Sequence, residues 1–163
     1  MNYLDIGAAD FELPQRWKIF ENEISPILFE PDIRAAEKLK YQNVQVFNVA
    51  LGKTHEKRDL LLTRKPQCSS FFRPNVKFLS KFPRLDRFDL IDQTTLDVVP
   101  LDSLNVKTDF IKIDTQGSEL EILKGAKNTL KSTLALEIEV SFHEIYEKQP
   151  LFNEVQSFLL ENG

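Results

Sequence analysis

The chain contains little of what secreted or membrane proteins usually carry. Cys68 is its one cysteine, so no internal disulfide can form, which fits a reducing compartment. No apolar run approaches the roughly 20 residues of a membrane span. The first residues lack the basic and apolar regions of a signal peptide. These absences predict a cytoplasmic protein with no membrane contact.

Basic residues are outnumbered by acidic ones, and glycine is scarce. There are 21 Lys and Arg against 25 Asp and Glu, and this net charge of -4 argues against broad nucleic-acid binding. A dinucleotide-binding turn needs three closely spaced glycines, whereas the turn after the first expected strand has Gly7 alone. This argues against a nicotinamide-dependent oxidoreductase, which remains a rival that a test for NAD binding can check.

Short apolar segments alternate with amphipathic ones over most of the chain. A length of 163 residues fits one domain, residues 1–163. The expected strands are residues 3–6, 26–30, 44–49, 110–113 and 134–140. The expected helices are residues 12–22, capped by Asp10, 33–40, capped by Asp32, 118–131 and 152–161, with Gly163 as a stop signal. This alternation predicts an α/β fold with a mostly parallel sheet.

The middle of the chain departs from this alternation. Residues 57–63 and 94–101 look extended, and residues 64–93 between them are rich in Phe, Pro, Lys and Arg. We expect residues 64–93 to be an insertion over the sheet rim, with a short helix near residues 75–81. Its basic residues could steer an anionic substrate or form a solvated face. Cys68-Ser69-Ser70 lacks a nearby base, so a solvated loop is favoured over a nucleophile.

Acidic residues stand at the ends of three expected strands. Asp5, Glu30 and Asp114 each follow a short apolar run. The carboxyl ends of parallel strands form one rim, where ligands bind in open α/β sheets. Gly7 would let the backbone pass close to a ligand, and Glu30 could accept the two hydroxyls of a ribose. The pattern predicts a nucleotide-like ligand across the rim.

A second group of polar residues follows the last two expected strands. Glu119 lies shortly after Asp114, while Glu139 and His143 lie at and beyond the end of residues 134–140. A His with several carboxylates could bind a divalent metal or perform acid–base chemistry. Because the spacing matches no compact metal motif, we favour a hydrogen-bonded acid–base site without metal.

Five segments, in order along nearly the whole chain, resemble the FkbM family of S-adenosylmethionine-dependent methyltransferases. They are Asp5-Ile6-Gly7-Ala8, Phe29-Glu30-Pro31, Asn48-Val49-Ala50-Leu51-Gly52, Leu101-Asp102-Ser103-Leu104 and Asp109-Phe110-Ile111-Lys112-Ile113-Asp114-Thr115-Gln116-Gly117-Ser118-Glu119. The resemblance implies a Rossmann-like class I methyltransferase sheet with helices on both faces. It also implies O-methylation of a hydroxyl on a small-molecule acceptor, a sugar or natural product.

The resemblance implies roles for individual residues. The cofactor-binding residues would be Asp5, Gly7, Ala8, Glu30, Asp32, Asn48, Val49, Ala50, Asp114 and Gln116. The catalytic residues would be Asp114, Glu119, Glu139 and His143.

The chain departs from the family pattern in two ways. Asp10 and Phe11 follow Ala9, where family members often have a second small residue. The family's sheet normally finishes with a strand hairpin, which we expect to be lacking because the chain stops at Gly163. An unpaired strand edge could pair with a second copy, so a homodimer is one expectation. The alternative to an active enzyme is a truncated, inactive cofactor-binding or scaffold remnant of the fold.

Overall fold

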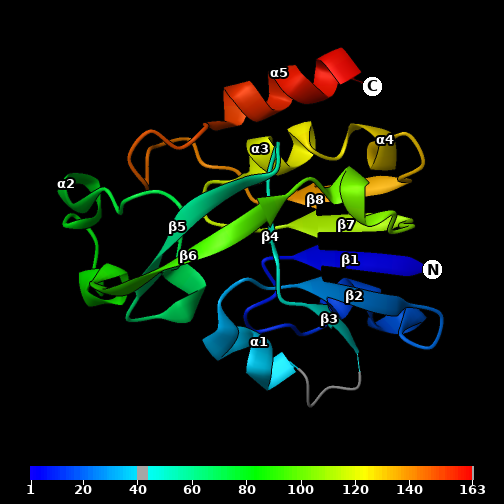
Figure 1. Cartoon of the computed structure of the whole chain (residues 1–163), viewed down its shortest axis with the longest axis horizontal. Coiled ribbons are helices and arrows are strands. Elements are labelled where there is room, and N and C mark those ends of the chain that lie inside the picture. The colour runs from blue at the N-terminus through cyan, green and yellow to red at the C-terminus, as the bar shows by residue number, and fades with distance from the viewer. Residues whose placement is uncertain (40–43, 163) are drawn as a thin grey trace.

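The computed structural model describes residues 1–39 and 44–162, and its centre is a five-stranded parallel sheet (Figure 1). The strands stand in the order β3 (Gln45–Phe47), β2 (Ser25–Phe29), β1 (Asn2–Ile6), β7 (Phe110–Ile113) and β8 (Ala135–Ile138). All neighbours run parallel. The order reverses between β1 and β7, which is the usual place for a ligand in such a sheet. The predicted α/β class is confirmed.

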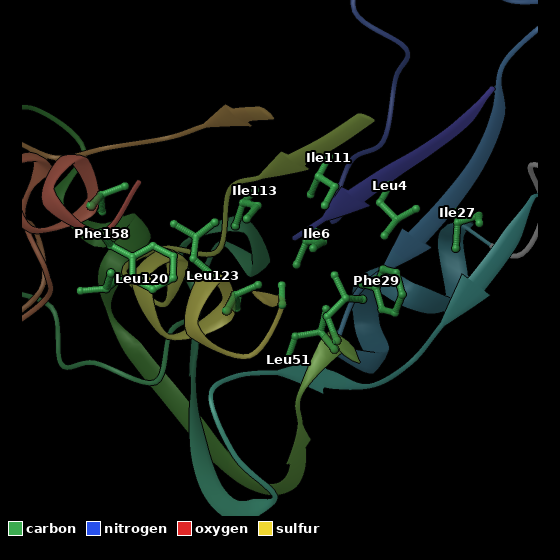
Figure 2. Packing of buried hydrophobic residues seen from close by; sticks show 14 residues of the cluster. Leu4, Ile6, Ile27, Phe29, Leu51, Ile111, Ile113, Leu120, Leu123 and Phe158 are labelled. Carbon is green, nitrogen blue, oxygen red and sulfur yellow. The ribbon is translucent and has the colours of Figure 1, made fainter. Parts of the chain in front are cut away.

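Alternation along the strands gives the sheet two different faces. On one face, Leu4 and Ile6 of β1 lie beside Ile111 and Ile113 of β7 in the main apolar core (Figure 2). Helices α3 (Glu119–Lys124) and α5 (Phe152–Asn162) cover this face. They contribute Leu120, Ile122, Leu123, Val155 and Phe158. Removing these side chains from water supplies the main driving force for folding.

The opposite face is covered by other elements. Leu28 of β2 packs with Leu39 of α1 (Ile33–Leu39). Trp17 of the 3-10 helix η1 (Gln15–Phe20) packs edge-on against Phe110, with ring centroids 4.8 Å apart. Helical elements therefore lie on both faces, as the resemblance implied.

A second sheet, not foreseen from the sequence, holds the middle of the chain. It has the order β4 (Ala50–Leu51), β6 (Leu90–Val99) and β5 (Glu56–Thr63). Strands β5 and β6 are antiparallel, and in Figure 1 they lie beyond the arrowheads of the main-sheet strands. Between them lie η3 (Pro66–Cys68), α2 (Val76–Leu79) and η4 (Leu85–Phe88). Helix α2 confirms the short helix expected there, while β6 begins four residues earlier than the predicted 94–101.

Two predicted helices are wrong in extent. The helix expected over residues 12–22 is only the short η1, because Leu13 precedes a proline and is biased away from helical angles. The N-cap position of η1 is Pro14, so the predicted cap at Asp10 is wrong. The helix expected over residues 118–131 divides at Gly125 into α3 and α4 (Lys127–Leu130). A Cβ on Gly125 would lie 2.0 Å from the backbone oxygen of Gly52, so the close approach of these two segments requires glycine there. Glycine inside a helix is unfavourable, and the helix ends at this residue.

Smaller elements complete the described chain. Helix η5 (Leu101–Leu104) leads into β7, and strand β8 has β7 as its one partner among the described residues. The predicted helix end at Lys40 and the stop signal at Gly163 lie outside the described residues. Within the described ranges, no helix has the length and apolar character needed to cross a membrane.

Candidate active site

A cavity of about 240 Å³ opens at the carboxyl ends of β1, β2 and β7. Asp5, Glu30 and Asp114, the three acids at strand ends, all line it. Strand β5 and the segment that follows it form the opposite wall. They contribute Leu60, Pro66, Gln67, Ser69 and Phe71. The Gln67 amide donates a hydrogen bond to the carboxylate of Asp10 across the cavity. The predicted meeting of the three acids at one rim is therefore confirmed.

The turn after β1 forms the floor of the cavity. Gly7 has φ +89°, a left-handed conformation that glycine adopts readily. The N–H groups of Gly7 and Ala8 both donate to the backbone oxygen of Phe29, at 2.9 and 3.2 Å. The turn is thus tied to the end of β2, and its small side chains leave room for a ligand.

Asp5 is buried but has a counter-ion. Its side chain is 3% exposed, and Lys112 Nζ donates to its Oδ1 at 2.9 Å. Burial raises the pKa of the Asp5 carboxyl, and Lys112 partly offsets this. Sequence analysis missed Lys112 as a site residue. The signal was available, since Asp5 and Lys112 are register partners on neighbouring strands and both interrupt apolar runs.

Glu30 is the most strongly perturbed acid in the cavity. Its side chain is 4% exposed, and burial raises its pKa to about 7. One oxygen, Oε1, accepts the N–H of Asp32 at 2.8 Å. Asn48 supports this corner from behind, because its side-chain amide donates to the backbone oxygens of Glu30 and Pro31 at 2.7 and 3.1 Å. Asn48 thus contacts the Glu30 backbone and lies outside the cavity lining.

Asp32 lines the cavity and is also paired within the protein. Its Oδ1 accepts the backbone N–H of Arg34 at 2.9 Å, which confirms its predicted capping of α1. Both carboxylate oxygens accept from the Arg34 guanidinium, and Arg34 also donates to Ser69 Oγ at 3.2 Å. Asp32 therefore joins the end of β2 to the segment that covers the cavity.

An apolar wall adjoins Glu30. Val49, Ala50, Leu51, Leu60 and Phe71 all line the same cavity. These side chains offer no hydrogen bonds, so this wall suits an uncharged ring or chain rather than a charged group.

Gln116 bridges two carboxyls, those of Asp114 and Glu139. The Gln116 side-chain amide donates from Nε2 to Asp114 Oδ1 at 2.8 Å and to Glu139 Oε2 at 3.0 Å. Glu139 is exposed at the surface, but partial desolvation and a hydrogen bond with Asp114 raise its pKa above its ordinary range. Two carboxyls this close favour sharing one proton. Glu139 is therefore the carboxyl of this pair whose protonated form the surroundings favour.

The two other predicted catalytic residues lie elsewhere. Glu119 is buried, and its Oε1 accepts from the N–H groups of Thr115 and Gly117, at 3.0 and 3.1 Å, inside the loop after β7. Its pKa is raised by burial. His143 is exposed on the chain after β8, with its ring 5.5 Å from that of Phe78. Both lie outside the lining of the main cavity.

No cluster of three His, Cys, Asp or Glu side chains suited to a metal occurs among the residues that the structure describes. The polar groups of this site are instead joined by hydrogen bonds to one another.

Comparisons with known proteins agree with this fold. A crystal structure described as methyltransferase FkbM from Methylobacillus flagellatus KT superposes with a TM-score of 0.60, covering 99% of this chain and 37% of that one at 18% identity. A curated relative, the 2-O-methyltransferase NoeI of Sinorhizobium fredii (strain NBRC 101917 / NGR234), is 27% identical over 160 residues, covering 90% of this chain. The chain spans 65% of that relative's length.

The methyltransferase FkbM domain model matches residues 5–163. That match includes the strand ends and the loop after β7 that build the cavity described above. The chain therefore belongs to the FkbM family of methyltransferases.

Proposed function

We propose that this protein uses S-adenosylmethionine to methylate a hydroxyl oxygen on a sugar or natural product. The observation that carries the proposal is the buried Glu30 carboxyl at the end of β2, which shares one cavity with Asp5, Gly7 and Asp114. Such an acid at the end of the second strand is suited to accept ribose hydroxyls.

The residues present fit this cofactor. Glu30 Oε1 holds the Asp32 N–H, while Oε2 accepts no hydrogen bond within the described part of the chain and would receive the ribose hydroxyls. Val49 and Ala50 on the apolar wall would hold the adenine. Asp5 and Gly7 would lie at the methionine end, where the Asp5 carboxylate can receive an ammonium group. When bound, S-adenosylmethionine supplies a methyl group activated by its sulfonium.

The Asp114 side of the cavity would handle the acceptor. A hydroxyl is a weak nucleophile, so the protein has to orient its oxygen and remove its proton as the new C–O bond forms. Asp114 lines the cavity and would take that proton, with Glu139 beside it. Glu119 would hold the loop in place. His143, although outside the cavity lining, is the second candidate for the base.

The class of acceptor is supported by the relatives. The NoeI protein is named a 2-O-methyltransferase, which supports a hydroxyl oxygen as the acceptor here. This chain spans 65% of that relative's length, so we propose the same class of acceptor for this chain from the relative's name alone.

Calorimetric titration with S-adenosylhomocysteine tests the cofactor site. We expect micromolar binding by the wild type and a loss of at least tenfold in Glu30→Gln. Glu37→Gln is the matched control, because Glu37 is an exposed acid on α1 outside the cavity lining. If folded wild-type protein does not bind, the inactive scaffold becomes the better explanation.

Asp114→Asn and His143→Gln separate the two candidate bases. With a panel of saccharides and a labelled methyl donor, loss of the true base should lower turnover by about 10²–10⁴-fold and leave S-adenosylhomocysteine affinity nearly unchanged. Equal losses in turnover and affinity for Asp114→Asn would place Asp114 among the cofactor-binding residues instead.

A further inference from the structure

Tyr146 is a buried tyrosine whose hydroxyl joins two parts of the site. Its side chain is 1% exposed, on the chain between β8 and α5. The hydroxyl lies 2.9 Å from the backbone oxygen of Cys68 and 3.0 Å from Oε1 of Gln116, so both acceptors are within hydrogen-bond distance of it. Tyr146 therefore contacts both the segment covering the cavity and the loop after β7.

The contacts on both sides of the Gln116 side chain fit one orientation of its amide. With Oε1 turned toward Tyr146, the NH₂ group faces Asp114 and Glu139 and donates to both, at 2.8 and 3.0 Å. The reversed amide would put a carbonyl oxygen against two carboxyls and remove both hydrogen bonds. The donor on one side and the acceptors on the other thus favour the same orientation.

The backbone of Gln116 is held as well. Gln116 has φ +58°, a left-handed conformation that is uncommon for residues other than glycine. Ser70 Oγ donates to the Gln116 backbone oxygen at 2.6 Å. Tyr146 is itself fixed, since its N–H donates to Gln149 Oε1 at 2.6 Å and its ring packs edge-on against Phe88. Such over-determined geometry is typical of functional loops.

We propose that Tyr146 is a positioning residue, whose hydroxyl orients the Gln116 amide so that it bridges the carboxyls of Asp114 and Glu139. The inference rests on the proposed function, in which this pair handles the acceptor proton. Without the hydroxyl, Gln116 loses the donor that fixes its Oε1, and the two carboxyls lose a fixed bridge. Hydrogen bonds donated to a carboxylate favour its ionised form, so their weakening should make the pair harder to ionise.

Carboxyl titration followed by ¹³C NMR tests this role without an acceptor. We expect Tyr146→Phe to move the titration of the Glu139 carboxyl in this pair upward by roughly half a unit or more, on a scale where one unit is a tenfold change in proton affinity. This variant leaves unchanged the charged and titratable groups that face the pair. They are Lys112, Glu119, Asp5 and Cys68.

Tyr3→Phe is the matched control. Tyr3 is also buried, but its hydroxyl has no hydrogen-bond partner among the described residues. Its removal should leave the pair's titration unchanged. An unchanged titration in Tyr146→Phe, or an equal shift in both variants, would overturn the proposal.

Two further readouts separate this inference from the proposed function. S-adenosylhomocysteine affinity in Tyr146→Phe should stay within about twofold of wild type, while failure of the wild type to bind bears on the proposed function alone. If Tyr146→Phe does not fold, the wild-type spectrum still decides. Gln116 side-chain amide protons that exchange slowly with water support the fixed bridge, and rapid exchange with water overturns it.

Discussion

The backbone oxygen of Asp114 occupies the space in which residue 7 would carry a side chain, since a Cβ built on Gly7 would lie 1.8 Å from it. The N–H of Asp114 also donates to the backbone oxygen of Ile6 at 2.9 Å. The ends of β1 and β7 therefore approach one another through the glycine. This close approach brings Asp5 and Asp114 into one cavity.

Gly7→Ala should be severely destabilising. The new methyl group would collide with backbone that cannot move without separating β1 from β7, and φ +89° is strained for alanine. We expect a loss of about 3 kcal/mol or more in the free energy of unfolding, measured by urea denaturation.

Gly52→Ala is the comparison for Gly7→Ala. A Cβ on Gly52 would meet only the side-chain Cγ1 of Val98, at 2.6 Å, and the side chain can shift more easily than backbone. Its cost should be clearly smaller. Equal costs would show that the contact between β1 and β7 has no special importance.

Cofactor affinity should depend on pH through Glu30. Burial raises the Glu30 pKa from 4.5 to about 7, and the ionised form is the better acceptor for ribose hydroxyls. If only the carboxylate binds well, S-adenosylhomocysteine affinity should fall about tenfold between pH 8 and pH 6, because about a tenth of the group is ionised at pH 6. In Glu30→Gln the affinity should be low at both pH values. A pH-independent wild type would contradict the assignment.

The same acid should affect stability in the opposite direction. Between pH 4.5 and about 7 the folded protein holds a proton on Glu30 that the unfolded chain releases. Its contribution to the free energy of unfolding is therefore full below pH 4.5 and is lost as pH rises through about 7. Glu30→Gln should raise the ligand-free melting temperature at pH 8 and change it little at pH 4.5. Exposed Glu37→Gln should show no such dependence.

Asp32→Asn should mainly reduce stability. Asparagine can still cap α1, but the partly buried Arg34 guanidinium would lose its ion partner. We expect a loss of about 3 kcal/mol in urea denaturation. The double variant Asp32→Asn with Arg34→Met should recover part of this loss, because no unpaired charge remains. If the double variant is worse by the sum of both single changes, Asp32 and Arg34 do not act as a pair.

Local sequence identified the acids at the strand ends, but not the residues from other parts of the chain that contact them. Asp5, Glu30 and Asp114 could be placed at one rim, because parallel strands end together and each acid follows an apolar run. Lys112 and Tyr146 were missed for different reasons. Lys112 needed the register between β1 and β7, whereas the Tyr146 hydroxyl reaches Gln116 and Cys68 through contacts that no local pattern encodes.

The second sheet was missed for a related reason. Residues of β5 and β6 were expected to be extended, but strand pairing between segments separated by the insertion depends on long-range contacts. Helix extents failed at Pro14 and Gly125, where local backbone constraints and close packing overrode apolar periodicity.

Glu119 shows why a catalytic and a supporting carboxylate have to be told apart by experiment. Its Oε1 accepts from the N–H groups of Thr115 and Gly117, and a glutamine side chain at this position could offer its carbonyl oxygen to the same donors. Glu119→Gln should therefore keep stability within about 1 kcal/mol, whereas Glu119→Ala should lose about 2 kcal/mol or more, because buried N–H groups are left unpaired. If Glu119 only supports the loop, Glu119→Gln also retains methyl transfer and S-adenosylhomocysteine affinity. A stable Glu119→Gln with turnover reduced about 10²-fold or more would instead make Glu119 part of the proton-transfer machinery.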